Sequence, residues 1–261
     1  MKPASSRRGI KTPNGLDQVY GVHALQSLLD RGEAPKELWV QQGAGSRLKE
    51  LVGQAQARGA RVSEQPRDLL DQLTQGAAHQ GVVAFCPPLT PEGEESLWLK
   101  LRAWPSSTPP LLLILDGVTD VHNFGACLRS ADAAGAHGVI VAKDKAAPLN
   151  ATVRKVACGA AEVVPVYQVT NLARTLAKLK DAGVWITGTA GEADASVFEI
   201  DMTGPTALVM GAEGKGLRRL TREACDNLAK LPMAGEVASL NVSVATGICL
   251  FEAVRQRHLA S

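Results

Sequence analysis

Six short apolar segments recur after residue 110, with helical patterns between them. They read LLLILDG, GVIVAK, EVVPV, VWITGTA, ALVMGAE and LAKLPM. Apolar strands that alternate with helices at this spacing build βαβ units, whose strands pair mostly in parallel. We therefore expect an α/β domain with a mostly parallel sheet over residues 111–261, closed by a helix over residues 243–258.

A proline-rich segment precedes this domain. Its prolines are Pro87, Pro88, Pro91, Pro105, Pro109 and Pro110. Proline removes backbone donors and fixes φ, so residues 87–110 are predicted to be a linker, in which residues 97–104 could form a short helix. Before the linker, apolar segments and helical patterns alternate again, which predicts a small α/β domain over residues 19–86. Residues 1–18 are expected to form a flexible tail that is basic at Arg7 and Arg8.

The composition excludes several classes of protein. Of the 261 residues, 45% are hydrophobic and 21% are charged, which is typical of a globular chain and not of a disordered one. The longest aliphatic run, residues 111–115, is far too short for a membrane helix, and the first residues lack the apolar core of a secretory signal. We expect a cytoplasmic protein without membrane contact. Because the formal net charge is only +2, a nucleic-acid site must come from local clusters.

The number and spacing of the cysteines indicate reduced thiols and not a metal site or a disulfide framework. They are odd in number and widely spaced, with no CxxC pair and no histidine at ligand spacing. No bound metal is therefore expected.

Three loops that follow predicted strands carry polar residues, and ligands bind at such loops in open α/β sheets. In the first loop, Asn123 lies on the turn after residues 111–117, and Arg129 follows it among small residues. An arginine at this position suits a phosphate or a carboxylate. The alternative is an asparagine that caps a helix and an arginine on a solvated surface.

The second loop lies in ALVMGAEGKGLRR, where Gly211, Gly214 and Gly216 allow backbone amides to approach a ligand closely. The order GxxGxG differs from both the Rossmann dinucleotide fingerprint and the Walker A loop. Glu213 is placed to bind a ligand donor. The densest basic cluster of the chain follows, and it either contacts a phosphate backbone or only solubilises the surface. Its members are Lys215, Arg218, Arg219 and Arg222.

In the third loop, Ser239, Asn241 and Ser243 alternate with apolar residues just before the closing helix. Side chains of this kind often cap helices. Capping requires only one of them, so three indicate a further role.

Together, the three loops resemble the three motifs of the SpoU family of RNA ribose 2'-O-methyltransferases, in the SPOUT superfamily. The residues that carry the resemblance are Asn123, Arg129, Glu213, Ser239 and Asn241. The segments YGVHALQSLL, GAAHQGVVA and LNATVRKVACGAAEVVPV extend it to members that methylate a guanosine ribose in the peptidyl-transferase region of 23S rRNA. The similarity covers nearly the whole chain.

The resemblance implies a SPOUT catalytic domain with a C-terminal trefoil knot, and an N-terminal RNA-binding domain similar to ribosomal protein L30. It also implies S-adenosylmethionine as the cofactor, in a pocket formed by the loops after three strands. The expected pocket residues are Thr189, Ala190, Gly191, Gly211, Leu231, Met233 and Leu240. Family members are homodimers, in which Arg129 of one subunit approaches the cofactor pocket of the other.

The resemblance also implies roles for the motif residues. Because a ribose hydroxyl is a weak nucleophile and arginine is a poor base, we expect Arg129 to hold the phosphate beside the target ribose and to stabilise the developing oxyanion. Asn123 and Asn241 would orient the nucleotide, and Ser239 would bind in the same network. Glu213 is expected to position the glycine-rich loop or Arg129.

Two other functions stay open at this point. One is ribose methylation of tRNA, and the other is a non-catalytic ribosome assembly factor, although a factor that only binds RNA has no need of all five motif residues. A Rossmann dehydrogenase is disfavoured because its fingerprint is missing. The expected partners are 23S rRNA or a large-subunit assembly intermediate and a second copy of the chain, with no DNA partner.

Overall fold

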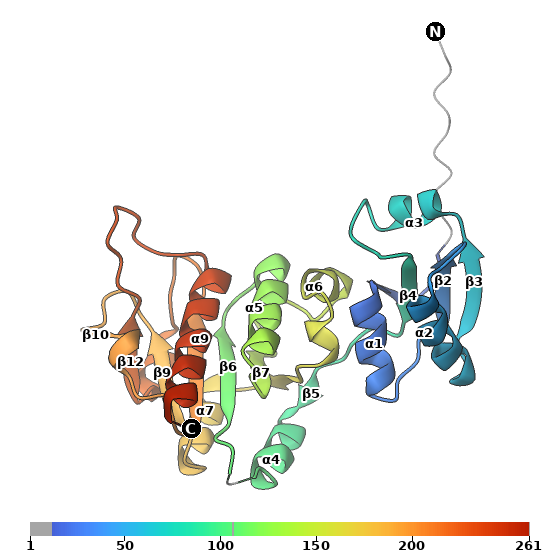
Figure 1. The fold of residues 1–261 in the computed structure, drawn as a ribbon. Helices are drawn as coiled ribbons and strands as arrows, with labels where there is room; N and C mark the ends of the chain where they lie inside the picture. The colour runs from blue at the N-terminus through green and yellow to red at the C-terminus, as the bar shows by residue number, and fades with distance from the viewer. Residues whose placement is uncertain (1–11, 106, 261) are drawn as a thin grey trace. The chain divides into compact units, whose positions relative to one another are not determined.

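The computed structural model describes residues 12–105 and 107–260, which form two compact units divided after Pro88 (Figure 1). The expected tail falls mostly outside these residues, including Arg7 and Arg8. Its last two positions belong to strand β1 (Asp17–Tyr20), which pairs antiparallel with β4 (Val82–Cys86). Only Val19 of β1 is buried, so the strand has too weak a hydropathy pattern to be recognised in the sequence.

In the N-terminal unit, four of the described strands form a sheet in the order β1-β4-β2-β3. Strands β2 (Glu37–Gln41) and β3 (Arg61–Gln65) pair in parallel, whereas β4 is antiparallel to its neighbours. The helices are α1 (Val22–Asp30), α2 (Ser46–Ala57) and α3 (Arg67–Leu73). Because alternate strand residues point to opposite faces, Leu38 packs with the leucines of α1 and α2, while Trp39 packs with Leu70 of α3.

In the C-terminal unit, eight described strands form one sheet in the order β10-β12-β9-β11-β6-β7-β8-β5. The strands pair in parallel throughout, as the alternation of segments predicted. They are β5 (Glu92–Gly93), β6 (Leu111–Asp116), β7 (Gly138–Ala142), β8 (Val166–Val169), β9 (Trp185–Thr189), β10 (Ala195–Ser196), β11 (Thr206–Gly211) and β12 (Asn227–Lys230).

Helices cover both faces of this sheet (Figure 1). Helices α5, α6 and α9 lie on one face, where Leu113 of β6 shares a core with Phe124 and Leu250. Helices α4 and α7 lie on the other face, where Ile114 shares a core with Leu97. The bounds are α4 (Glu94–Arg102), α5 (Val121–Ala133), α6 (Ala151–Val156), α7 (Leu172–Asp181), α8 (Arg219–Ala224) and α9 (Val242–Ala260), with 3-10 helices η1 (Ala160–Glu162) and η2 (Val197–Glu199).

The strand order reverses beside β6. From β6 the chain adds β7 and β8 on one side, and then builds β9 and β11 on the other side, with β11 between β9 and β6. Because these strands are parallel, the carboxyl ends of β6, β9, β11 and β12 meet at one edge of the sheet. Ligand sites of open α/β sheets lie at this kind of reversal.

The C-terminal end of α9 is fastened to the opposite edge of the sheet. Arg257 donates hydrogen bonds of 2.7–3.1 Å to the carbonyl oxygens of Met202, Gly204, Pro109 and Pro110, beside the starts of β6 and β11. One guanidinium therefore joins backbone segments that are far apart in the sequence.

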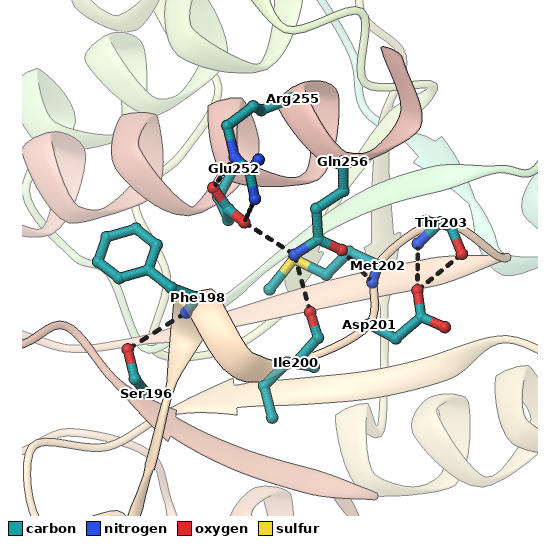
Figure 2. Close-up of polar contacts among 9 residues, drawn as sticks. All are labelled: Ser196, Phe198, Ile200, Asp201, Met202, Thr203, Glu252, Arg255 and Gln256. Atoms are coloured by element: carbon teal, nitrogen blue, oxygen red, sulfur yellow. Dashed lines mark hydrogen bonds and ion pairs between the residues drawn. The ribbon is translucent and has the colours of Figure 1, made fainter. Parts of the chain in front are cut away.

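A second contact fixes the segment after η2 to α9. Gln256 donates to the carbonyl oxygen of Ile200 at 2.9 Å and accepts from the N–H of Met202 at 2.8 Å (Figure 2). Glu252 accepts from Gln256 at 2.8 Å and also binds Arg255, which orients the amide (Figure 2). The chain before β11 is thus held through its own peptide groups.

The structure differs from two expected boundaries. Residues 87–110 are more than a linker, since β5 pairs with β8 and Leu97 of α4 is buried in the core of the C-terminal unit. The strand predicted in EVVPV begins only at Val166, because η1 occupies residues 160–162 and Pro165 has no N–H for a strand ladder.

Candidate functional site

A cavity of about 570 Å³ lies at the carboxyl ends of β9, β11 and β12, beside the loop before α9. Its deep wall includes Met210 and Ala229, which are fully buried. The residues expected to form the cofactor pocket all line it, and they are Thr189, Ala190, Gly191, Gly211, Leu231, Met233 and Leu240. Elements far apart in the sequence therefore build one site at the strand reversal.

The glycine-rich loop folds back on the end of β11. A Cβ added at Gly211 would lie 2.3 Å from the carbonyl carbon of Gly216, so no side chain fits there. Gly214 and Gly216 have φ values of 72° and 64°, which glycine adopts without strain, and the Gly216 N–H donates to the Ala212 carbonyl oxygen at 2.8 Å. The glycines thus allow the closure of a tight turn.

Three motif residues meet in one hydrogen-bonded network. The Asn241 side-chain amide donates to Asn123 Oδ1 at 2.8 Å and to Glu213 Oε1 at 2.7 Å. Asn241 Oδ1 accepts from the N–H and the hydroxyl of Ser243, at 2.9 and 2.6 Å. Asn241 therefore caps α9 and also joins the first and second motifs.

Asn123 is not the helix cap that the alternative interpretation supposed. The N-cap of α5 is Asp120, whose Oδ1 accepts from the Asn123 N–H at 2.8 Å. This arrangement leaves the Asn123 side chain free for Asn241. Ser239 lines the cavity, but within the described residues no hydrogen bond links it to the network.

Arg129 lies apart from this network. It is exposed on α5, and its Nη1 lies 3.7 Å from Sγ of Cys158, which follows α6. It does not line the cavity at the carboxyl ends of β9, β11 and β12. Of the five predicted catalytic residues, Glu213, Ser239 and Asn241 line the cavity, Asn123 is joined to Asn241 by a hydrogen bond, and Arg129 lies outside.

The predicted basic cluster is largely neutralised. Arg218 binds Asp116, Arg219 lies 2.7 Å from Glu223, and Arg222 binds Glu192. Lys215 has no ion-pair partner among the described residues. Three of the four cations therefore have carboxylate partners, which the run of basic residues in the sequence did not reveal.

Asp116 is a site residue that the motif analysis did not assign. It ends β6, is fully buried, and accepts from the backbone N–H of Arg218 at 2.8 Å and from its guanidinium. This contact ties the glycine-rich loop to the first motif. A carboxylate at the end of an apolar strand was the available signal, because a buried charge requires a partner.

Another cavity of about 570 Å³ lies on the other side of the network. It is lined by residues of the first motif, by Lys145 and by the glycine-rich loop, and it shares Glu213 and Lys215 with the first cavity. The network around Asn241 therefore has a cavity on each side.

The buried thiols near the network are unsuited to nucleophilic chemistry. Burial raises the pKa of Cys127 to about 11 and that of Cys249 to about 12, so both are protonated at neutral pH.

In the described part of the chain, no three His, Cys, Asp or Glu side chains are grouped to hold a metal ion. Within residues 12–105 and 107–260, no helix combines the length and the apolar character that a membrane crossing requires.

Two family models match the chain. Residues 110–251 match the SpoU rRNA Methylase family, and residues 18–92 match a family described as RNA 2'-O ribose methyltransferase substrate binding. The first match covers more than half of the chain and includes every residue of the network.

Relatives and solved structures agree with this match. The 23S rRNA (guanosine-2'-O-)-methyltransferase RlmB of Pseudomonas aeruginosa is 58% identical to this chain, over 92% of this chain and 97% of the relative. The RlmB protein of Escherichia coli is 55% identical, over 92% of this chain and 99% of the relative. The SpoU methyltransferase AviRb from Streptomyces viridochromogenes, solved in complex with the cofactor AdoMet, has a TM-score of 0.76 at 27% identity, over 97% of this chain and 95% of that one. The resemblance is confirmed: the chain belongs to the SpoU rRNA methylase family.

Proposed function

We propose that the protein transfers a methyl group from S-adenosylmethionine to the ribose 2'-hydroxyl of a guanosine in 23S rRNA. The observation that carries this proposal is the network in which Asn241 joins Asn123 and Glu213 at the cofactor cavity. The names of the relatives at 55–58% identity supply the substrate class. We place the target guanosine in the peptidyl-transferase region and the reaction in the cytoplasm during ribosome biogenesis.

The cavity fits the cofactor in size and polarity. Pockets for ligands of this size typically measure about 300–1,000 Å³. Leu231 and Leu240 offer apolar surface for an adenine, and the backbone of Thr189 to Gly191 offers polar groups beside it. When bound, S-adenosylmethionine supplies an already activated methyl group, so the protein has to align the ribose hydroxyl and stabilise the charge that develops on its oxygen.

The residues around the cavity divide these tasks. Asn123 and Asn241 orient the target nucleotide, and Ser239 assists from the rim. Glu213 fixes the Asn241 amide, which holds the glycine-rich loop against the start of α9. Arg129 binds the phosphate beside the target ribose and stabilises the oxyanion, because a guanidinium is a strong anion ligand and a poor base.

The exposed position of Arg129 favours a shared site. On α9, Val244 and Phe251 are each 51% exposed and Ile248 is 36% exposed, one helical turn apart. A second copy of the chain would cover this apolar stripe in a two-fold homodimer and bring its Arg129 to the cofactor cavity.

We also propose that the path of α9 completes a C-terminal trefoil knot, that residues 19–86 form an L30-like RNA-binding domain, and that DNA is not a partner.

Two other functions remain as alternatives. The match of residues 18–92 to a substrate-binding family favours an enzyme over an assembly factor that only binds RNA. The relatives named for 23S rRNA favour ribosomal RNA over tRNA.

The decisive experiment uses purified protein, labelled S-adenosylmethionine, and 23S rRNA or large-subunit intermediates from cells that lack the enzyme. We expect one 2'-O-methylguanosine in 23S rRNA, mapped by its resistance to alkaline cleavage. Methylation of tRNA alone, or of a base, would contradict the proposed substrate. Binding of RNA without methyl transfer by the wild-type protein would favour the assembly factor.

A further inference from the structure

An ion pair lies in the wall of the cofactor cavity. The Arg222 guanidinium, from α8, contacts the Glu192 carboxylate, from the turn after β9, and both residues line the cavity. The side chains remain 39% and 62% exposed, so the pair lies where the cavity opens to solvent. The turn that carries Glu192 is anchored by Ala193, which is buried and donates to the Ala190 carbonyl oxygen at 3.1 Å.

This pair differs from the other charges of the cavity. Among the described lining residues, Lys215 and Lys230 offer positive charge, and Glu213 is engaged by the Asn241 amide. The Glu192 and Arg222 side chains place both signs of charge at one point of the opening. The deep wall at Met210 and Ala229 is apolar and buried. Polarity therefore increases from the base of the cavity to its mouth.

S-adenosylmethionine, the cofactor of the proposed function, likewise has one end suited to an apolar wall and one charged end. Its adenine suits an apolar wall, whereas its amino-acid end carries an α-ammonium and an α-carboxylate. We propose that Glu192 and Arg222 form the subsite for this zwitterionic end, with Glu192 binding the α-ammonium and Arg222 binding the α-carboxylate. The inference rests on the proposed function and extends it to two residues outside the three motifs.

Physical reasons favour the amino-acid end over the ribose as the partner of this pair. Ribose hydroxyls would use the Glu192 carboxylate and leave Arg222 without a ligand, whereas a zwitterion satisfies both. The planar guanidinium fork also matches a carboxylate in geometry. Since the two side chains already hold each other in place, little side-chain freedom remains to be lost on binding.

The test compares two ligands that share adenine and ribose but differ in the amino-acid end. Isothermal titration calorimetry of the full chain measures Kd for S-adenosylhomocysteine, which has that end, and for 5'-methylthioadenosine, which lacks it. In E192Q and in R222Q, Kd for S-adenosylhomocysteine is expected to rise about tenfold, the effect of losing one charge-assisted contact at a solvated opening. Kd for 5'-methylthioadenosine is expected to stay unchanged.

The matched controls are R219Q and E223Q. These residues form an ion pair of 2.7 Å on the same helix, are 76% and 55% exposed, and lie outside the cavity lining. Both affinities should stay at the wild-type value in these variants, and thermal unfolding of all variants reports whether the fold is intact. Equal weakening of both ligands in E192Q or R222Q, or unchanged affinity for S-adenosylhomocysteine, would overturn the subsite. A wild-type chain that binds neither ligand would overturn the proposed function itself.

Discussion

Helix α9 connects two regions whose polar side chains bind different kinds of group. At its start, Asn241 binds the side chains of Asn123 and Glu213. Near its end, Arg257 binds backbone carbonyl oxygens such as those of Met202 and Pro109. Side chains that bind other side chains at an open cavity are available to a ligand. A side chain that binds partly buried peptide groups is committed to the fold, because those groups need partners in every state of the site.

The comparison predicts that substitutions at the start of α9 change activity more than stability, and that substitutions at its end do the reverse. Arg129 is expected to behave like the residues at the start of α9, because among the described residues it is not held by a buried peptide group and its guanidinium contacts the exposed Cys158 thiol at 3.7 Å.

Arg129→Ala is expected to have the largest effect. The turnover number kcat should fall about 10³-fold, because the guanidinium acts on charge that develops in the transition state. Kd for S-adenosylhomocysteine and the melting temperature should stay at their wild-type values, since the side chain is exposed and lies outside the cavity. Steady-state kinetics measures kcat, isothermal titration calorimetry measures Kd, and thermal unfolding measures the melting temperature.

Mixing inactive subunits sharpens this prediction. If the site is shared, dimers of one Arg129→Ala subunit and one Asn241→Ala subunit keep one intact site, so activity returns after subunit exchange. A monomer at assay concentration, or no recovery after verified exchange, would argue against the shared site.

Asn241→Ala should lower kcat about a hundredfold, which is roughly 2.7 kcal/mol, because Asn123 and Glu213 lose their common partner. The free energy of unfolding should fall by only about 1 kcal/mol, the usual loss for a helix cap. Chemical denaturation measured beside the kinetics separates the two effects. A loss of stability large enough to explain the loss of activity would remove the distinction between the two ends of α9.

Arg257→Ala should show the opposite pattern. The free energy of unfolding is expected to fall by about 2 kcal/mol, because several backbone carbonyl oxygens lose a charged donor, while kcat per folded molecule stays constant. Arg255→Ala is the matched control, since Arg255 is 57% exposed and pairs with Glu252 on the same helix. If the control loses as much stability as Arg257→Ala, the backbone contacts are not the cause.

The smallest effect concerns the middle of α9 and depends on pH. Burial raises the pKa of Cys249 to about 12 from an ordinary value of 9.0. The folded state therefore favours the protonated thiol, and this stabilisation is complete below pH 9 and is lost as the pH rises towards 12. At pH 10 the ionisation of this thiol in the unfolded chain lowers the free energy of unfolding by about 1 kcal/mol. The urea midpoints measured at pH 8 and at pH 10 should differ less in Cys249→Ala than in the wild type, and an equal difference in both proteins would contradict the prediction.

Much of the fold could be predicted because its signals are local. The segments LLLILDG and GVIVAK are apolar runs bounded by turns, and each forms a central strand. The short edge strands β1 and β5 were missed, since β1 buries one residue and β5 has two exposed ones. Their pairing depends on backbone hydrogen bonds to a neighbour, and hydropathy does not report these.

The motif residues and the cavity lining were predicted from the sequence, because the resemblance depends on residue types at fixed spacing within each loop. The tertiary structure alone decided which of them touch. Asn241 reaches Asn123 across 118 positions only because β11 lies between β6 and β9. The same strand order gives Arg218 its partner Asp116 and leaves Arg129 outside the network. Local patterns determine strands, helices and turns, whereas contacts between distant loops depend on the order of the strands, which no local pattern encodes.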